Sequence, residues 1–208
     1  MEIQIDGSGL RKIAAADQRV TLTRSVTGAV DVLKANAASL IVAWQAFVPM
    51  QENTINWGNQ YFCFATSTTL VMNAVITMNS QSNAPMQAGF VYQFAQGQFA
   101  MQQPPQDENR YIVTNATQNS LAFGLAQSVT VNGQPPMLAP LCVVPVGYNQ
   151  SAYFTPSATI GIFLSNAAAA GTLLPPPRDA CLVSAPKGGG SEPVIGFDDQ
   201  TNAFYQKS

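Results

Sequence analysis

The sequence predicts an all-β fold: a single antiparallel β-sandwich or jelly-roll-like domain with extended terminal segments. Roughly ten short runs rich in β-branched and aromatic residues are separated by Gly, Pro, Asn and Ser, which is the pattern of an all-β domain. No alternation of helix and strand patterns supports a nucleotide-binding α/β fold. The chain has 208 residues, enough for one domain with a substantial core.

The chain divides into three parts. We expect residues 1–18 to be an N-terminal arm or edge segment and residues 19–174 to be the β-sandwich core. Residues 175–208 form a C-terminal segment that contains Pro and Gly. The boundary before this segment is marked by Pro175 to Pro177, because consecutive prolines stiffen the backbone into an extended conformation.

The first strand patterns are short. Ile3 and Ile5 alternate with polar neighbours, which predicts a short strand that ends at the glycine-rich residues 7–9. The alternation over residues 19–24 predicts a half-buried strand. Residues 26–44 are ambiguous between helix and strand, and we expect a loose turn or short helix followed by a strand that ends at Pro49.

The clearest period-two pattern runs from Leu70 to Asn79 and predicts a strand with one face in the core. Phe90, Tyr92 and Phe94 share one face of the strand expected next, and a turn leads from it into a strand over residues 99–101. Further short strands are expected at residues 111–114, 121–125, 128–131, 141–146, 152–154, 159–164 and 194–197.

Charge is scarce in the central part of the chain. Charged residues make up 10% of the sequence, against about 25% in an ordinary globular domain. From Ala35 to Pro177 the charged side chains are Glu52, Asp107, Glu108 and Arg110, whereas the whole chain holds 14 Asn and 19 Gln. The net charge of −2 offers no basic surface for phosphates, so we expect no nucleic-acid partner.

The residue types argue against catalysis. The sequence contains no His, which excludes Ser-His-Asp and Cys-His nucleophiles and histidine-bound metals. A glycosidase needs two carboxylates on either side of the scissile bond. The adjacent pairs Asp107-Glu108 and Asp198-Asp199 instead lie in turn-rich surface segments. We therefore expect a protein that is not an enzyme and has no metal site and no cofactor.

Two features bear on the location of the chain. The residues from Met1 to Asp6 lack the basic and apolar regions of a secretory signal, so the chain is expected to be intracellular or a mature secreted protein. No run of about 18 apolar residues occurs, and no transmembrane segment is expected.

The chain has three cysteines, an odd number. Cys63 and Cys142 lie in apolar runs, whereas Cys181 follows the prolines and is a candidate for an intermolecular disulfide.

Two segments have the composition of binding surfaces. Aromatic rings and planar amides together suit a sugar, so Trp57, Tyr61, Asn56 and Asn59 form a candidate carbohydrate site. The alternative is a turn whose Trp57 caps the end of the sandwich. Phe90, Tyr92, Phe94 and Phe99, interleaved with Gln, are candidates for self-association, and the alternative is an ordinary core strand beside a polar loop.

We expect a non-enzymatic structural protein that assembles with copies of itself into an oligomer, a shell or a dense protein particle. Interface cores are depleted of Lys, Glu and Asp, and the central part of this chain is depleted in the same way. The first alternative is a lectin-like carbohydrate-binding module on the same fold. A weaker alternative is an all-β membrane-active toxin, because such proteins carry amphipathic hairpins rich in Ser, Thr, Asn and Gln.

Overall fold

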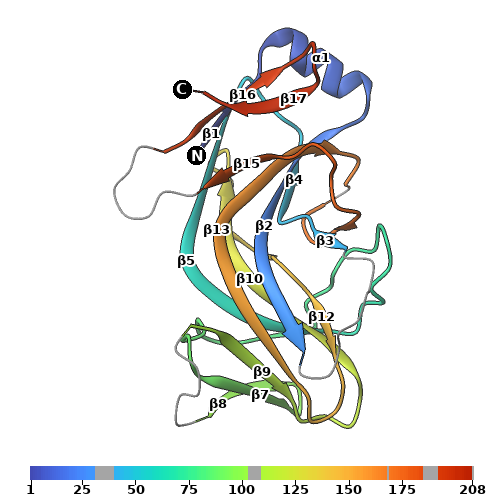
Figure 1. The fold of residues 1–208 in the computed structure, drawn as a ribbon, viewed down its shortest axis with the longest axis vertical. Helices are drawn as coiled ribbons and strands as arrows, with labels where there is room; N and C mark the ends of the chain where they lie inside the picture. Colours follow the sequence, from blue (N-terminus) through green and yellow to red (C-terminus); the bar gives the residue numbers. More distant parts are fainter. Residues whose placement is uncertain (31–39, 103–108, 168, 185–191, 208) are drawn as a thin grey trace.

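The computed structural model describes residues 1–30, 40–102, 109–167, 169–184 and 192–207. Within these ranges β-strands predominate, and the one helix is α1 (Gly7–Ala15). The strands form two large sheets and one small sheet (Figure 1). The prediction of an all-β protein is confirmed. No helix in the described ranges has the length and apolar character needed to cross a membrane.

The strands pair in three groups. In the described part of the chain, the first sheet has eight strands in the order β11-β10-β5-β1-β16-β17, with β12 beside β10 and β6 beside β5. Its strands are β1 (Glu2–Gln4), β5 (Glu52–Thr66), β6 (Ser80–Gln81), β10 (Leu121–Val131), β11 (Met137–Pro140), β12 (Val144–Val146), β16 (Val194–Asp198) and β17 (Ala203–Gln206).

The second sheet has seven strands within the described ranges, in the order β4-β2-β13-β9-β7-β8, with β15 beside β13. Its strands are β2 (Arg19–Val30), β4 (Gln45–Phe47), β7 (Val91–Ala95), β8 (Gln98–Gln102), β9 (Tyr111–Asn115), β13 (Ser151–Ser165) and β15 (Cys181–Ser184). The small sheet pairs β3 (Ile41–Val42) with β14 (Leu173–Leu174).

Both large sheets are mixed, which corrects the purely antiparallel fold expected from the sequence. β1 runs parallel to β16, with Ile3 opposite Ile195. β7 runs parallel to β9, with Tyr92 opposite Val113. Local alternation of polar and apolar residues reports which face of a strand is buried, but it carries no information on the direction of the neighbouring strand.

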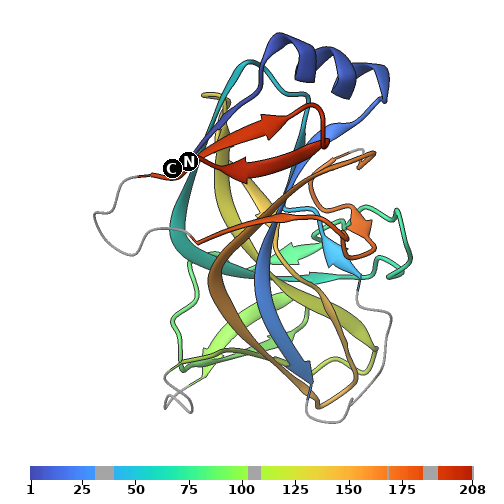
Figure 2. The same cartoon turned by 45° about the horizontal axis from the view of Figure 1, so that its top comes forward.

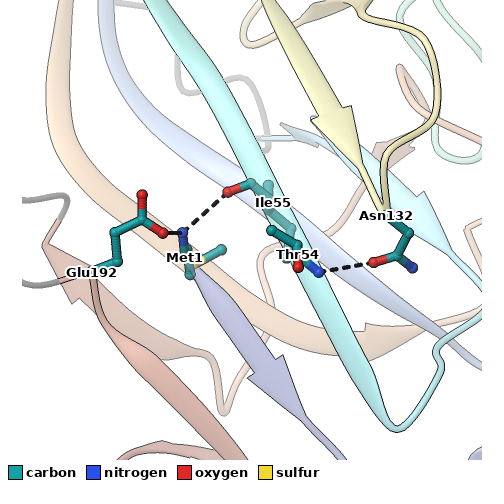
Figure 3. A network of polar contacts seen from close by, with 5 residues as sticks. All are labelled: Met1, Thr54, Ile55, Asn132 and Glu192. Carbon is teal, nitrogen blue, oxygen red and sulfur yellow. Dashed lines mark hydrogen bonds and ion pairs between the residues drawn. The ribbon is translucent and has the colours of Figure 1, made fainter.

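The described residues at both ends of the chain belong to the first sheet, and the short strands expected near Ile3 and at residues 194–197 are present as β1 and β16. β1 lies between β5 and β16, and β16 pairs with β17. The amino group of Met1 donates to the carbonyl oxygen of Ile55 at 3.1 Å and contacts Oε2 of Glu192 at 2.5 Å (Figure 3). The two termini consequently lie close together (Figure 2).

The residues after β1 form a helix where the glycines predicted a break. The Asp6 side chain caps α1, because its Oδ1 accepts from the Gly9 N–H at 2.7 Å and from the Ser8 hydroxyl at 2.8 Å. These two hydrogen bonds also lower the pKa of Asp6. A Cβ at Gly9 would lie 2.8 Å from the Phe197 ring, so the glycine allows α1 to pack closely on β16.

Residues 70–79 do not form the predicted strand. Asn73 has a positive φ of 66°, and the Ala74 N–H donates to the Val71 carbonyl in a turn. Met72, which belongs to the face that the predicted strand would bury, is 59% exposed. Of the ambiguous residues 26–44, those up to 30 belong to β2, residues 31–39 lie outside the described ranges, and residues 41–42 form β3.

The main hydrophobic cluster draws side chains from both large sheets. Leu22 and Phe154 contribute from the second sheet, and Phe123 and Leu125 from the first. α1 and the β16–β17 pair lie at one end of the molecule, and β7, β8 and β9 lie at the other (Figure 1). The long strands β2, β5, β10 and β13 run between these ends and hold the site described next.

Candidate functional site: a buried arginine beside an apolar cavity

Arg24 lies on the inward face of β2. Val20 and Leu22 are fully buried on this strand, and the period of two places the residue at position 24 on the same face. Arg24 is therefore buried as well, with 7% of its surface exposed. A cation on the core face of a strand is uncommon, because burying a charge is costly unless it is well paired.

The partners of Arg24 are neutral. Its Nη1 donates to Oε1 of Gln127 at 2.5 Å and its Nε to the carbonyl oxygen of Ser157 at 3.4 Å. Its Cζ lies 5.9 Å from the centre of the Trp44 ring and 5.7 Å from that of Tyr61, so both rings contribute cation–π attraction. Within the described ranges no carboxylate forms an ion pair with Arg24. Desolvation lowers the pKa of Arg24.

Gln127 fixes this arrangement from the opposite sheet. It is fully buried on β10. Its Oε1 accepts from Arg24, and its Nε2 donates to the carbonyl oxygen of Gly58 at 2.5 Å. The pairing of β5 with β10 shifts register between Gln127 and Val129. Such an irregularity removes backbone groups from the ladder, which leaves the Gly58 carbonyl for the glutamine side chain.

The aromatic residues of the candidate carbohydrate site belong to the same cluster. The Trp57 ring packs edge-on against Trp44 with centroids 5.8 Å apart. The Tyr61 ring packs against Tyr111 at 5.2 Å. Both Trp57 and Tyr61 are partly buried. Both rings therefore pack against other aromatic side chains of the same chain.

The amides of the candidate carbohydrate site lie elsewhere on the same strand. Asn56 precedes Trp57 on β5, so its side chain lies on the opposite face of the strand. Asn56 and Asn59 are both exposed, and Asn59 lies where the register of β5 shifts against β10. The structure therefore separates Asn56 from the aromatic face with which the sequence grouped it.

Trp44 carries an unusual polar atom. The residue is fully buried, and its indole Nε1 has no hydrogen-bond partner within the described residues. A buried donor without a partner costs roughly 1–3 kcal/mol. The buried cluster around Arg24 therefore combines a cation without a carboxylate and a donor without an acceptor.

A cavity of about 830 Å³ lies beside this cluster. The stretch Thr23–Gly28 of β2 forms one wall, and the segment from Leu141 to Pro145 forms the other. Five apolar residues complete the lining: Leu40, Ile41, Val42, Leu70 and Leu173. Among the lining residues that fall in the described ranges, Arg24 is the one that carries a charge. The lining thus includes residues of β2, β3, β12 and β14, of which β2, β3 and β12 are labelled in Figure 1.

The cavity exists because β2 loses one neighbour. β4 pairs with β2 only from Val20 to Leu22. From Thr23 onward, β2 has β13 on one side and no strand on the other within the described part of the chain. The two walls meet again at Gly28, where an added Cβ would lie 3.2 Å from Cγ1 of Val144.

The second wall is fixed from behind by β10. A Cβ at Gly124 would lie 1.9 Å from the carbonyl oxygen of Cys142, so glycine alone allows the backbones to approach. The Leu141 N–H donates to the Leu125 carbonyl at 2.7 Å. Burial raises the pKa of the Cys142 thiol to about 12, which makes it a poor nucleophile at neutral pH.

The candidate self-association aromatics contribute to the core. Tyr92 and Phe94 are buried, and Phe90 and Phe99 are partly buried against the main cluster. The Phe94 ring lies 4.7 Å from Phe99 and 5.3 Å from Phe123, measured between centroids. Their rings are therefore engaged within one chain, and any contact with a second copy has to use the strand edges around them.

The cysteines and carboxylates form neither a disulfide nor a metal-ligand group in the described ranges. Cys63, Cys142 and Cys181 are free thiols, and Cys181 is partly buried on β15. No three His, Cys, Asp or Glu side chains gather there as metal ligands. Asp198 accepts hydrogen bonds from the Gln200 N–H and the Thr201 hydroxyl, as turn carboxylates do. Asp107 and Glu108 lie outside the described residues.

The chain matches no family model, and comparisons with curated proteins and with solved structures give no match. We therefore infer the function from the geometry of this chain.

Sequence reasoning missed Arg24, although a signal was present. The alternation that predicts the strand at residues 19–24 already places the arginine in phase with Val20 and Leu22. Gln127 and Trp44 carried no comparable signal. Their contact with Arg24 depends on how two sheets meet, which local sequence patterns do not encode.

Proposed function

We propose that this chain is a non-enzymatic structural protein in which the two large sheets pack as a β-sandwich and copies join through strand edges. The observation that carries the proposal is the exposed edge of β8. β8 ends the seven-stranded sheet, with β7 as its hydrogen-bonded neighbour within the described residues.

β8 lacks three of the features that protect an edge strand from pairing, namely charged residues, Pro and a bulge. Its sequence, from Gln98 to Gln102, contains no charged residue and no Pro, and its register with β7 is regular from Val91 to Ala95. Four of its five residues are exposed, including Met101. An uncharged, regular edge strand is a template for a strand of another chain.

The composition of the surface agrees with this proposal. Free monomers carry charged surfaces that oppose association, whereas the central part of this chain carries amides and hydroxyls. An amide side chain loses less solvation free energy than a charge when an interface covers it. Pairing of β8 with β8 of a second copy would place Gln98 and Gln102 near each other across the new ladder.

The test is the assembly state of the wild type and of two matched variants. Ala100→Lys adds a positive charge to an exposed residue in the middle of β8, and Val71→Lys adds the same charge to an exposed turn. Size-exclusion chromatography with light scattering, followed by electron microscopy, should show assemblies for the wild type and Val71→Lys. Ala100→Lys should remain monomeric. A wild type that is monomeric at high concentration, or an Ala100→Lys variant that assembles equally well, would refute the proposal.

A further inference from the structure

We propose that the cavity beside Arg24 binds a small amphipathic molecule that has an apolar body and a single anionic group. This site is independent of the edge of β8, which lies at the end of the molecule formed by β7, β8 and β9 (Figure 1). Three properties of the cavity support this proposal: its size, the chemistry of its walls and the charge of Arg24.

The size suits a small organic molecule. Ligand pockets in proteins have volumes of about 300–1,000 Å³, and this cavity has about 830 Å³. The cavity is partly open at the surface, so a molecule could enter it without unfolding the chain. The cavity is maintained by backbone contacts at its wall, because Gly124 holds the segment at Cys142 in place from behind.

The walls suit an apolar body. The side chains from β3, β14 and the segment 141–145 are aliphatic, apart from the Cys142 thiol. Polar groups come mainly from β2, where Thr23, Ser25 and Thr27 line the cavity beside a strand edge without a neighbour. The cavity thus has an apolar floor and one hydrogen-bonding side, which would orient a molecule that has two chemically different ends.

The charge selects an anion. Arg24 is a buried cation whose protein partners are an amide, a carbonyl and two aromatic rings. None of these partners neutralises its charge, and a monoanion in the adjacent cavity would. Hydrogen bonds to charged groups contribute more than neutral ones. A carboxylate, a sulfonate or a phosphate monoester would supply the same charge complementarity.

The experiment uses the full-length protein and four probes. Binding of 1-anilinonaphthalene-8-sulfonate is followed by its fluorescence, and dodecanoate, dodecan-1-ol and dodecyltrimethylammonium compete with it. For the wild type, dodecanoate should compete at a concentration at least about tenfold lower than the alcohol or the cation, since a charge-assisted hydrogen bond contributes about that factor or more. Equal competition by all three compounds, or no binding of the fluorescent probe, would overturn the proposal. Dodecyl sulfate and dodecyl phosphate then distinguish the kinds of anion.

Three variants locate the site. Arg24→Met should bring dodecanoate to within about twofold of dodecan-1-ol, and Arg19→Met, on the same strand outside the cavity, should leave the preference unchanged. Val42→Trp fills the cavity and should abolish binding of every probe. Circular dichroism confirms that each variant is folded. If Arg24→Met does not fold, Val42→Trp and the wild-type preference decide: dodecanoate binding that survives Val42→Trp would refute the assignment to this cavity.

Discussion

Nη1 of Arg24 donates a hydrogen bond to Oε1 of Gln127 across 2.5 Å, and this contact joins β2 of one large sheet to β10 of the other. Both residues are buried. The glutamine is anchored in turn by the Gly58 carbonyl. The two polar side chains therefore stabilise one another, and each should be costly to remove alone.

Gln127→Leu should lower the free energy of unfolding by about 2–4 kcal/mol, because it removes the hydrogen-bond partner of Nη1 of Arg24 and of the Gly58 carbonyl. Arg24→Met alone should also destabilise the protein, since it leaves Oε1 of Gln127 without its donor. The double variant should be destabilised by at least about 1 kcal/mol less than the sum of the single variants. Urea unfolding followed by circular dichroism measures all four proteins. Additive effects would show that the contact contributes nothing specific.

Gly124→Ala should destabilise the protein severely. The new Cβ would lie 1.9 Å from the Cys142 carbonyl oxygen and 2.6 Å from the Phe64 ring, and a backbone atom cannot move aside as a flexible side chain does. Overpacking of this kind costs about 1–3 kcal/mol or more. Gly58→Ala is the matched control, because nothing lies within 4 Å of a Cβ there. Thermal denaturation should show a large drop in Tm for the first variant and little change for the second.

Local sequence patterns predict some elements of this fold and not others, for physical reasons. The strands expected at residues 19–24, 121–125 and 128–131 are present, because their β-branched and apolar residues fit a pleated, half-buried surface. The first continues to Val30 as β2, and the other two are one continuous strand, β10. The strand at residues 70–79 was predicted wrongly, because alternation does not reveal that Asn73 adopts a positive φ. The helix after Asp6 was not predicted, because Gly7 and Gly9 in its first turn indicate a break, whereas the Asp6 cap is seen in the structure.

The residues of the candidate site could be predicted from the sequence less well than the fold. The sequence indicated Trp57 and Tyr61 as sugar-binding residues. They do lie near the Arg24 cluster, but their rings pack against Trp44 and Tyr111. The cavity itself could not be predicted, since it depends on where β4 ends along β2. That is a matter of tertiary contacts, which no local pattern reports.

Cys181 should be the thiol that joins two chains when the protein is oxidised. It is only partly buried on β15, although its side chain lies on the face opposite the exposed Leu182 and packs against the main cluster. Cys63 is fully buried and cannot reach a second chain in the folded state. A non-reducing gel of the oxidised protein should show a dimer band that Cys181→Ser removes and Cys63→Ser retains. A dimer band that persists in Cys181→Ser would assign the bridge to another cysteine.

The buried thiol of Cys63 should make the stability of the protein fall at alkaline pH. Desolvation raises the pKa of Cys63 from 9.0 to about 12 in the folded state. The folded protein therefore holds this proton more tightly than the unfolded chain. The resulting stability is fully present below pH 9.0 and is lost as the pH rises toward 12, with a slope of at most about 1.4 kcal/mol per pH unit.

Urea unfolding at a series of pH values from neutral to alkaline, in the presence of a reducing agent, measures this effect. Other groups titrate in the same range, so the informative quantity is the difference between the wild type and Cys63→Ala. The variant loses packing at every pH, but its stability should fall less steeply above pH 9.0 because the titrating thiol is gone. Parallel stability curves for the two proteins would show that Cys63 titrates alike in the folded and unfolded states.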